Sequence, residues 1–574
     1  MIHKWIINEL TPEQKACKET LLKETSFSPT ICELLAKRGI SDKKSAEAFF
    51  CPTKEQIHDP ALYNDMDKAV ERLDKAMRNN EKVLVYGDYD VDGTTAVALV
   101  YKFLTGINFT NIDFYIPDRY DEGYGVSYKG IDYAAEHGFS LMIVLDCGIK
   151  AVEKVKYAKE KNIDIIICDH HTPDEVLPDA VAVLDAKRTD STYPYRELSG
   201  CGVGFKFMQA VAKSNNIPAD HLEALLDLLA ISIASDIVPI TGENRALMTL
   251  GLKRLNTNPC IGVRAILKVC ELDTRKDITT SDIVFKIGPR INASGRMSSG
   301  REAVELLISK NLDDAMARSG RINTYNQERK ELDKTITEQA KEQIASNPDF
   351  KNLKSTVVYN KDWSKGVIGI VASRLSETYF RPTVVLTRSN GFVTGSARSV
   401  SGFDIYKAID SCRDLLENFG GHIFAAGLTL KEENVEEFKR RFDLYVQENM
   451  GKEQYVPQIE ADTEISLDEI TPEFFNTLQK FAPFGPENLK PVFITNNVID
   501  HGSKRVGKEL DHLKVEVADP QTGACMNGIA FGMGKEFYEH LHSGKPVGVC
   551  YTVEENDFNG RKTLQLMVKD IKKQ

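Results

Sequence analysis

Five short apolar runs, rich in β-branched residues, alternate with helical segments between residues 82 and 185. The runs are "KVLVYG" (82–87), "IDFYIP" (112–117), "SLMIVLD" (140–146), "IDIIICD" (163–169) and "AVAVLD" (180–185). Continuous rather than alternating hydrophobicity is typical of parallel strands, because helices cover both faces of such a sheet. The sequence therefore predicts a doubly wound α/β domain in this region.

The chain is too long for one core, since 574 residues correspond to three or four domains at about 150 residues each. We expect a helical N-terminal extension (1–60), a catalytic α/β domain (61–310), a solvent-exposed connecting helix (311–348) and a second, smaller α/β lobe (349–452). In residues 453–574, short alternating strands and an Asn559-Gly560 turn predict a small β-barrel of the oligonucleotide-binding type.

Composition excludes several classes of protein. The sequence contains neither a run of about 18 uncharged apolar residues nor a signal peptide, so we expect a cytoplasmic protein with no membrane contact. The eleven cysteines are scattered without a CxxC pair, which indicates neither a disulfide framework nor a thiolate zinc site. The net charge of -11 argues against coating nucleic acid by bulk electrostatics but leaves room for a local basic groove.

Acidic and imidazole side chains follow three strands of the predicted sheet. Asp88, Asp90 and Asp92 come directly after the first strand, Asp146 ends the third, and "CDHHT" places Asp169, His170 and His171 after the fourth. The carboxyl ends of parallel strands meet at one crevice, so these groups are expected to converge there. A single Asp after a strand is commonly a turn former or a helix N-cap, which is the interpretation we keep for Asp185, but three such strand ends fit that interpretation poorly.

Clustered carboxylates disfavour one another's ionisation unless a cation neutralises them. Oxygen ligands with a minority of imidazole and no thiolate favour Mn²⁺ or Mg²⁺. Two such ions about 3.5–4 Å apart activate a water and stabilise the leaving oxygen in phosphoester hydrolysis. Asp236, in the apolar "IASDIVP", can complete the ligand set, although a salt bridge to Arg245 is an alternative.

The motifs "GDYDVDGTTA", "LDCG", "CDHH", "SGCGVGFK" and "ASDIVP" resemble the DHH phosphoesterase superfamily in order and spacing. Within it, "IGPRINASGRM", "RINTYNQER" and "NFGGHIFAAGLTL" resemble the RecJ family of bacterial exonucleases, from about Lys82 to the C-terminus. The resemblance implies a DHH core, a DHHA1-like second lobe and a C-terminal OB-fold. It also implies a single-strand-specific 5′→3′ DNA exonuclease that releases mononucleotides in DNA repair and recombination.

The resemblance assigns roles to individual residues. Two Mn²⁺ or Mg²⁺ ions would be ligated, with Asp146 as the bridge, by Asp90, Asp92, Asp146, His170 and Asp236. Asp88, Asp169 and His171 would orient these ligands or contact the scissile phosphate. Many relatives carry His where this chain has Tyr86, so Asp88 or a water would complete the set of ligands to one ion.

The direction of cleavage requires a pocket for the terminal phosphate, and arginine binds phosphate bidentately. The family pattern places Arg119, Ser396 and Arg398 around the 5′-phosphate, and Arg290, Asn292 and Arg296 near the scissile bond. It assigns Gly420, Gly421 and His422 to substrate contact, in what the spacing suggests is a strand-to-helix turn. From the residues alone, exposed surface arginines and a simple helix-entry turn remain alternatives.

The implied partners are single-stranded DNA with a 5′-phosphate, single-strand-binding protein and a repair helicase, and we expect a monomer. One alternative is a DHH phosphoesterase that acts on pyrophosphate, a cyclic dinucleotide or a short oligonucleotide. Another is a catalytically inactive DNA-binding scaffold.

Overall fold

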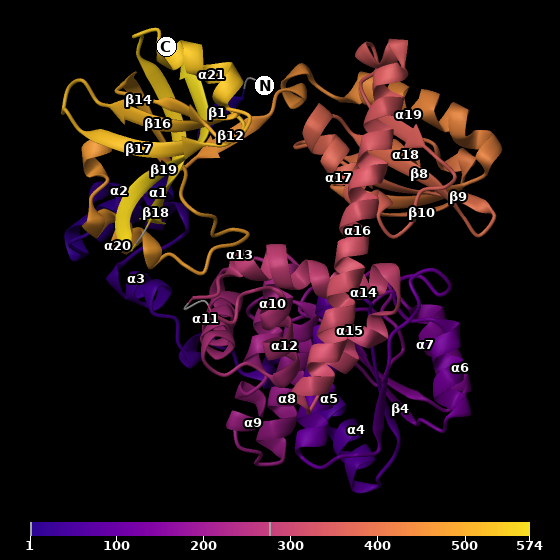
Figure 1. The fold of residues 1–574 in the computed structure, drawn as a ribbon. Helices are drawn as coiled ribbons and strands as arrows, with labels where there is room; N and C mark the ends of the chain where they lie inside the picture. Colours follow the sequence, from indigo (N-terminus) through magenta and orange to yellow (C-terminus); the bar gives the residue numbers. More distant parts are fainter. Residues whose placement is uncertain (1–2, 275–276, 559, 574) are drawn as a thin grey trace. The chain divides into compact units, whose positions relative to one another are not determined.

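The structure, a computed structural model, describes residues 3–274, 277–558 and 560–573 (Figure 1). Its internal contacts divide the chain into two compact units, each of which is discontinuous in sequence. The larger unit comprises residues 58–236 and 250–457, and the smaller comprises residues 1–57, 237–249 and 458–574. The helix α11 (Gly242–Thr257) begins in a segment of the smaller unit and ends in the larger.

The larger unit is built on an all-parallel sheet of five strands in the order β3-β2-β4-β5-β6. Its strands are β2 (Val83–Gly87), β3 (Ile112–Tyr115), β4 (Leu141–Leu145), β5 (Asp164–Cys168) and β6 (Ala182–Leu184). On one face, α6 (Tyr128–Glu136) and α7 (Val152–Glu160) contribute Ile131, Ala134, Val155 and Ala158 to a shared apolar cluster. α5 (Val91–Gly106) and α8 (Gly200–Ser214) are the other helices that pack on the sheet. The predicted doubly wound α/β core is confirmed.

Further helices surround this core. They are α4 (Met66–Arg78), α9 (Asp220–Glu223), α10 (Leu226–Ser235), α12 (Ile261–Val269), α13 (Thr280–Asp282), α14 (Gly288–Met297) and α15 (Gly300–Leu307). A π-helical turn, Ile283–Ile287, leads into α14. The apolar stretch before Asp236 forms two helices, α9 and α10, and Asp236 caps the C-terminus of α10.

The connecting helix α16 (Leu312–Ser346) is not solvent-exposed all round, contrary to our expectation. Ile336, Ala340 and Ile344 are buried in a cluster with residues of α17 (Ile368–Tyr379), whereas Leu332 remains 36% exposed. The helix therefore contributes one face to the core of the lobe that follows it.

That lobe contains a five-stranded sheet in the order β10-β11-β9-β8-β7. Its strands are β7 (Thr356–Tyr359), β8 (Thr383–Ser389), β9 (Phe392–Arg398), β10 (Leu416–His422) and β11 (Ala425–Leu430), and its remaining helices are α18 (Ile405–Asp410) and α19 (Val435–Asn449). β10 and β11 form an antiparallel hairpin. The strand-to-helix turn predicted at Gly420, Gly421 and His422 is therefore wrong, because these residues end a strand that turns back into another strand.

The smaller unit contains the predicted barrel. Its strands are β13 (Thr463–Glu464), β14 (Phe493–Asp500), β15 (Lys504–Val506), β16 (His512–Ala518), β17 (Cys525–Ala530), β18 (Val547–Phe558) and β19 (Arg561–Lys573). The order β14-β18-β19-β17-β16, together with a β14–β16 pairing, closes a five-stranded barrel of the OB type. The predicted turn between β18 and β19 includes Asn559, which lies outside the described residues, but the strands on either side pair antiparallel.

N-terminal helices complete the core of this barrel. α1 (Pro12–Glu24), α2 (Pro29–Lys37) and α3 (Lys43–Phe50) share an apolar cluster with the barrel strands and with α20 (Pro472–Gln479) and α21 (Gly534–Leu541). The N-terminal segment was expected to be helical, yet β1 (Lys4–Ile7) pairs in parallel with β12 (Gln458–Ala461). Trp5 Nε1 also donates to Asp570 Oδ2 at 2.7 Å. In the described part of the chain, no helix has the length and apolar character needed to span a bilayer.

Candidate active site

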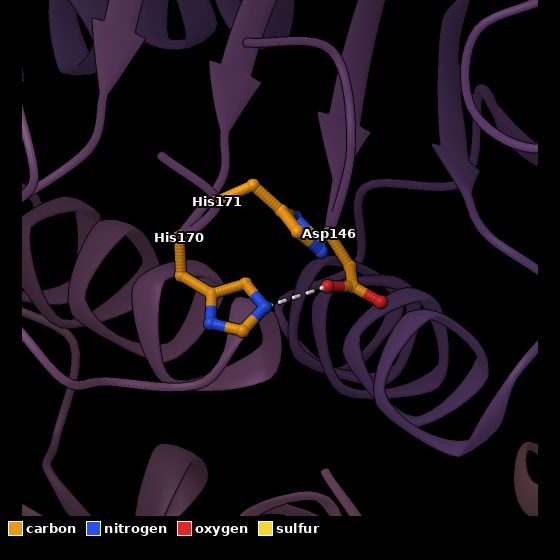
Figure 2. Close-up of side chains that lie close together, drawn as sticks. All are labelled: Asp146, His170 and His171. Atoms are coloured by element: carbon orange, nitrogen blue, oxygen red, sulfur yellow. Dashed lines mark ion pairs between the residues drawn. The ribbon is translucent and has the colours of Figure 1, made fainter. Parts of the chain in front are cut away.

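His170 lies at the centre of a cluster of carboxylates. Its Nε2 is 3.2 Å from Asp146 Oδ1, 3.5 Å from Asp236 Oδ2 and 3.9 Å from Asp92 Oδ2. Figure 2 shows the ring nitrogen of His170 directed at the Asp146 carboxylate, with His171 beside them. The four residues come from the start of α5, the ends of β4 and β5, and the end of α10, so the topology brings them together across almost 150 residues.

The N-terminus of α8 holds the Asp92 carboxylate. The backbone amides of Gly200 and Cys201 donate to its two oxygens at 2.6 and 2.8 Å, and the Ser232 hydroxyl donates at 2.6 Å. Helix N-termini favour anions because their first amides are unpaired. Position 200 requires glycine, since a Cβ there would lie 2.6 Å from Asp146 Cβ. The motif "SGCG" thus orients one carboxylate and leaves room for another.

Asp146 adopts a left-handed backbone conformation, with φ of 59°. Such conformations are unfavourable for residues with a Cβ and are concentrated at functional sites. The Tyr124 hydroxyl donates to the Asp146 carbonyl at 3.0 Å and contacts the His171 ring at 3.2 Å. This tyrosine therefore ties the turn after β4 to the turn after β5.

Asp169 fixes the position of His171. Its Oδ1 lies 2.7 Å from His171 Nδ1 and accepts from the His170 amide at 2.7 Å, while its Oδ2 accepts from the Ile149 amide at 2.9 Å. Burial favours the neutral acid, but the hydrogen bond and charge of His171 outweigh it and lower the pKa of Asp169 to about 2. Burial also disfavours the charged imidazole, but Asp169 raises the pKa of His171 above its ordinary value. Asp169 thus orients the His171 ring through Nδ1.

Protein cations compensate the remaining acidic groups only in part. Burial, and then the charges of neighbouring aspartates, raise the pKa values of Asp88, Asp90, Asp146 and Asp236. Among the described residues, no hydrogen-bond partner is found for Asp88 Oδ2, Asp146 Oδ1 or either ring nitrogen of His170. Buried polar atoms without partners are costly, so this donor set fits divalent cations that accept carboxylate oxygen and imidazole nitrogen.

Two alternatives from the sequence can be compared with the contacts. Arg245 donates to the carbonyls of Phe481, Ala482 and Pro483 within the smaller unit, and its guanidinium lies over the Phe49 ring, so these contacts account for its charge without Asp236.

The Tyr86 hydroxyl donates to the Gly125 carbonyl at 2.8 Å and accepts from the Ser127 amide at 3.1 Å. Tyr86 therefore anchors the loop at 125–127.

A group of cations, which we call the arginine cluster, lies in the same unit and consists of Arg119, Arg296, Arg329 and Arg398. Burial and then the charges of the other three lower the pKa of Arg296 to about 10. The Arg119 guanidinium lies 4.0 Å from the centre of the Tyr89 ring and favours ionisation of Asp88 and Asp90. The cluster therefore borders the acidic site, and its arginines are not isolated surface residues.

Arg398 is positioned by polar contacts on the second lobe. It donates to Ser396 Oγ at 3.0 Å and to Ser373 Oγ at 3.2 Å, and a Cβ on Gly369 would lie 3.1 Å from its Nη2. Ser396 and Arg398 occupy alternate positions on β9, so both side chains lie on one face of the sheet. The first turn of α17 lies against that face.

The residues assigned to the scissile region lie on α14. Arg290 donates to Asn323 Oδ1 of α16 at 2.9 Å and to the Lys286 carbonyl at 2.8 Å. Arg296 donates to the Gly366 carbonyl at 2.8 Å and so connects the catalytic core with the second lobe. Asn292 lines a cavity of about 210 Å³ together with Arg296, Arg329 and Ile370.

The β10–β11 hairpin belongs to the same sheet as Arg398, with β11 lying between β10 and β9. Ala425 is the register partner of Arg398, and Gly421 is paired with Ala426. Gly421 has a φ of 145°, and a Cβ there would lie 2.4 Å from the Ala425 carbonyl oxygen. Phe424, at the hairpin tip, is 61% exposed. The structure thus brings 420–422 and 396–398 to one sheet.

Sequence reasoning missed several residues of this region. Arg329 belongs to the arginine cluster, and Lys365 is close enough to Arg119 for that charge to lower its pKa. The signal for Arg329 was available, since it is the last residue of "RINTYNQER". No spacing rule indicated Ser373 or Gly200.

Three family models match successive parts of the chain: the DHH family N-terminal domain at 82–233, the DHHA1 domain at 352–448 and the RecJ OB domain at 461–570. The single-stranded-DNA-specific exonuclease RecJ of Salmonella typhimurium is 31% identical, over 97% of this chain and 98% of its own length. The chain belongs to the RecJ family. The RecJ of Bacillus subtilis is 34% identical over 99% of this chain and 70% of its own length.

Solved RecJ structures have the same fold. RecJ from Thermus thermophilus in complex with Mn²⁺ superposes with a TM-score of 0.84 at 24% identity, covering 100% of this chain and 80% of the other. An exonuclease RecJ bound to manganese gives a TM-score of 0.59 at 28% identity, over 67% of this chain and 95% of that one. The predicted RecJ fold, with a DHH core, a DHHA1-like lobe and an OB-type barrel, is confirmed.

Proposed function

We propose that this chain is a metal-dependent exonuclease that hydrolyses single-stranded DNA from its 5′ end and releases mononucleotides. The observation that carries the proposal is the convergence of Asp92, Asp146, His170 and Asp236 beside the arginine cluster, in a chain that aligns over nearly its full length with single-stranded-DNA-specific exonucleases. A nuclease needs both features, because it must hold cations that stabilise the reacting phosphate and cationic side chains that bind its neighbours.

The metal-binding residues we propose are Asp90, Asp92, Asp146, His170 and Asp236. Their oxygen-rich donor set suits a pair of Mn²⁺ or Mg²⁺ ions, the metals with which relatives have been crystallised. When bound, such ions supply positive charge to the attacking and leaving oxygens of the phosphodiester. The Asp146 carboxylate is closer to His170 Nε2 than those of Asp92 and Asp236, and Asp146 is our candidate for the ligand shared by both ions.

The surrounding residues orient this set and the scissile phosphate. The α8 amides hold the Asp92 carboxylate in one rotamer, and Asp88 lies close enough to Asp90 to act on its charge. Asp169 holds the His171 ring through Nδ1, and we assign Nε2, which contacts the Tyr124 hydroxyl at 3.2 Å, to hydrogen bonding with an oxygen of the phosphate. We assign Asp88, Asp169 and His171 to these positioning contacts.

Cleavage from one end requires recognition of the terminal phosphate. We propose that Arg119, Ser396 and Arg398 bind the 5′-phosphate, where guanidinium groups form charge-assisted bidentate hydrogen bonds. Arg290, Asn292 and Arg296 would contact the backbone next to the scissile bond. Gly420, Gly421 and His422, on β10 of the same sheet as Arg398, would border the first nucleotide.

Each part of the chain has its own role in the proposed reaction. Residues 61–310 carry the chemistry, 311–348 connect, and 349–452 hold the terminal nucleotide. The barrel at 453–574, joined by the segment 1–60, binds the strand farther from the end, since OB-folds bind single strands with little sequence preference. In the cytoplasm, single-strand-binding protein and a repair helicase would supply such substrates to a monomer in repair and recombination.

One experiment tests metal dependence, strandedness and polarity together. Oligonucleotides labelled at the 5′ or the 3′ end, single-stranded or duplex, are digested with Mn²⁺ or Mg²⁺ and with a chelator. We expect mononucleotides from the 5′ end of single strands only, and no product with chelator. Equal digestion of duplexes, or release from the 3′ end, would contradict the proposal. Faster turnover of pyrophosphate or a cyclic dinucleotide would favour the small-substrate alternative.

A further inference from the structure

A second group of metal-binding side chains lies on the barrel of the smaller unit. His501 follows β14, Glu516 is on β16 and Cys525 begins β17. The three residues meet because these strands are neighbours: Ala518 is the register partner of Cys525, and the His501 amide donates to the Glu516 carbonyl at 2.9 Å. One ligand atom from each residue lies within 4.8 Å of the other two.

The spacing of these atoms is close to that of a tetrahedral site. His501 Nδ1 lies 3.1 Å from Glu516 Oε1 and 3.9 Å from Cys525 Sγ. Ligand atoms about 2.0–2.3 Å from a zinc ion, at tetrahedral angles, stand roughly 3.3–3.6 Å apart. The third pair, Glu516 and Cys525, lies within 4.8 Å, so rotation of these solvent-accessible side chains would bring all three atoms onto one ion.

The chemistry of the group separates it from the candidate active site. A thiolate with an imidazole and one carboxylate favours a thiophilic ion such as Zn²⁺, whereas Mg²⁺ and Mn²⁺ favour oxygen. Cys525 is exposed and forms no disulfide with the other described cysteines. The side chains of His501 and Glu516 are also accessible to solvent, so an ion can enter without rearrangement of the barrel.

We propose that His501 Nδ1, a Glu516 carboxylate oxygen and the Cys525 thiolate form a Zn²⁺ site, with water in the fourth position. Binding forms a zinc–sulfur bond and releases the Cys525 thiol proton to solvent, with no change in oxidation state. The ion would tie the chain segment after β14 to β16 and β17. This site is independent of the exonuclease proposal, because none of its residues lies in the proposed catalytic machinery.

Cobalt titration of the full chain tests the site directly. Co²⁺ bound by a thiolate gives a sulfur-to-metal charge-transfer band in the near ultraviolet, and oxygen and nitrogen ligands do not. We expect the metal-free, phosphine-reduced protein to develop this band as Co²⁺ is added, up to one thiolate-bound ion per chain, and to lose it when Zn²⁺ is added. Cys525→Ser should abolish the band, and His501→Ala should weaken Co²⁺ binding at least about tenfold.

Cys51→Ser is the matched control, because Cys51 is the other exposed cysteine among the described residues and belongs to no such group. It should leave the band unchanged. Absence of the band in the parent protein, or its persistence in Cys525→Ser, would overturn the proposal.

Alkylation supplies a second readout that does not depend on spectra. With the reduced full-length protein, Zn²⁺ should slow iodoacetamide modification of Cys525 at least about tenfold and leave that of Cys51 unchanged, whereas Mg²⁺ should protect neither. Equal modification of Cys525 with and without Zn²⁺ would refute the site, even if a variant proved difficult to fold.

Discussion

The residues of the candidate active site are held in place by backbone groups more than by other side chains. Two amides of α8 bind Asp92, three amides bind Asp169, and a left-handed backbone directs Asp146. Backbone donors cannot move away as a long side chain can. The carboxylates therefore keep their positions although burial, and then mutual repulsion, raise the pKa values of several of them.

Replacement of Asp146 is the first test of this arrangement. Asp146→Ala should lower the rate of single-strand hydrolysis by at least about a thousandfold, because the proposed shared ligand of both ions is lost. Binding of single-stranded DNA in the presence of Ca²⁺ should change little, since the arginine cluster and the barrel remain. Gel-based digestion and fluorescence anisotropy measure the two effects, and hydrolysis at the parent rate would show that the metal assignment is wrong.

Replacement of Arg398 tests whether recognition of the 5′-phosphate sets the direction of cleavage. Arg398→Ala should reduce the preference for 5′-phosphorylated over 5′-hydroxyl single strands by about 10- to 100-fold, since a charge-assisted hydrogen bond contributes about 1.5–3 kcal/mol. Arg388→Ala is the control, because Arg388 is an exposed arginine on the neighbouring strand β8. The ratio of kcat/KM values for the two substrates is the measurement, and an unchanged ratio in Arg398→Ala would exclude this residue from the terminal pocket.

At the scale of elements, hydrophobic periodicity and the positions of strand ends were enough to predict the parallel sheet and part of the candidate active site. The parallel sheet followed from uninterrupted apolar runs, and the convergence of Asp92, Asp146 and His170 followed from the rule that the carboxyl ends of its strands meet. β1 was missed because four residues with one partner strand leave almost no local pattern. The Gly420–His422 hairpin was misassigned because glycines permit either kind of turn, and only tertiary pairing decides between them.

The Zn²⁺ site we propose shows the same limit. Motif reasoning found no thiolate zinc site, because such sites are recognised by short spacings such as CxxC. The register of neighbouring strands brings together His501, Glu516 and Cys525. The spacing of residues along the sequence does not reveal that register.

The connecting helix offers a test of element packing. Ile336→Ala should lower the free energy of unfolding by about 2–5 kcal/mol, because Ile336 is 4% exposed and packs in the apolar cluster between α16 and α17. Leu332→Ala, one turn earlier and 36% exposed, should cost less than about 1 kcal/mol. Urea denaturation followed by circular dichroism compares the two variants, and equal costs would contradict a one-sided buried face.

At the scale of the whole molecule, the two ends of the chain build one unit. Leu21, Ile31 and Leu34 of the N-terminal helices share a cluster with Phe493 and Val515 of the barrel. Most of the residues between 58 and 457 therefore form a separate compact unit, from which both ends are excluded.

Truncation tests whether the N-terminal helices and the C-terminal barrel depend on each other for a common core. A fragment of residues 1–457 should bind a hydrophobic dye and aggregate, because the apolar face of α1–α3 loses its partner. A fragment of residues 58–457 should stay monodisperse and keep chelator-sensitive hydrolysis, with weaker binding to long single strands. Light scattering and digestion assays compare the fragments, and greater dye binding by 58–457 than by 1–457 would contradict this division.

The pairing of β1 with β12 has a consequence for biosynthesis. Lys4 cannot meet Gln458 until the ribosome has added about 450 more residues, which at about 5–20 residues per second takes roughly 25–90 s. Throughout that interval the apolar faces of the nascent N-terminal helices lack their barrel partner while the nuclease core is synthesised. The barrel strands must then pack around helices that were synthesised long before them, so the barrel matures late and the apolar faces of these helices need shielding until then.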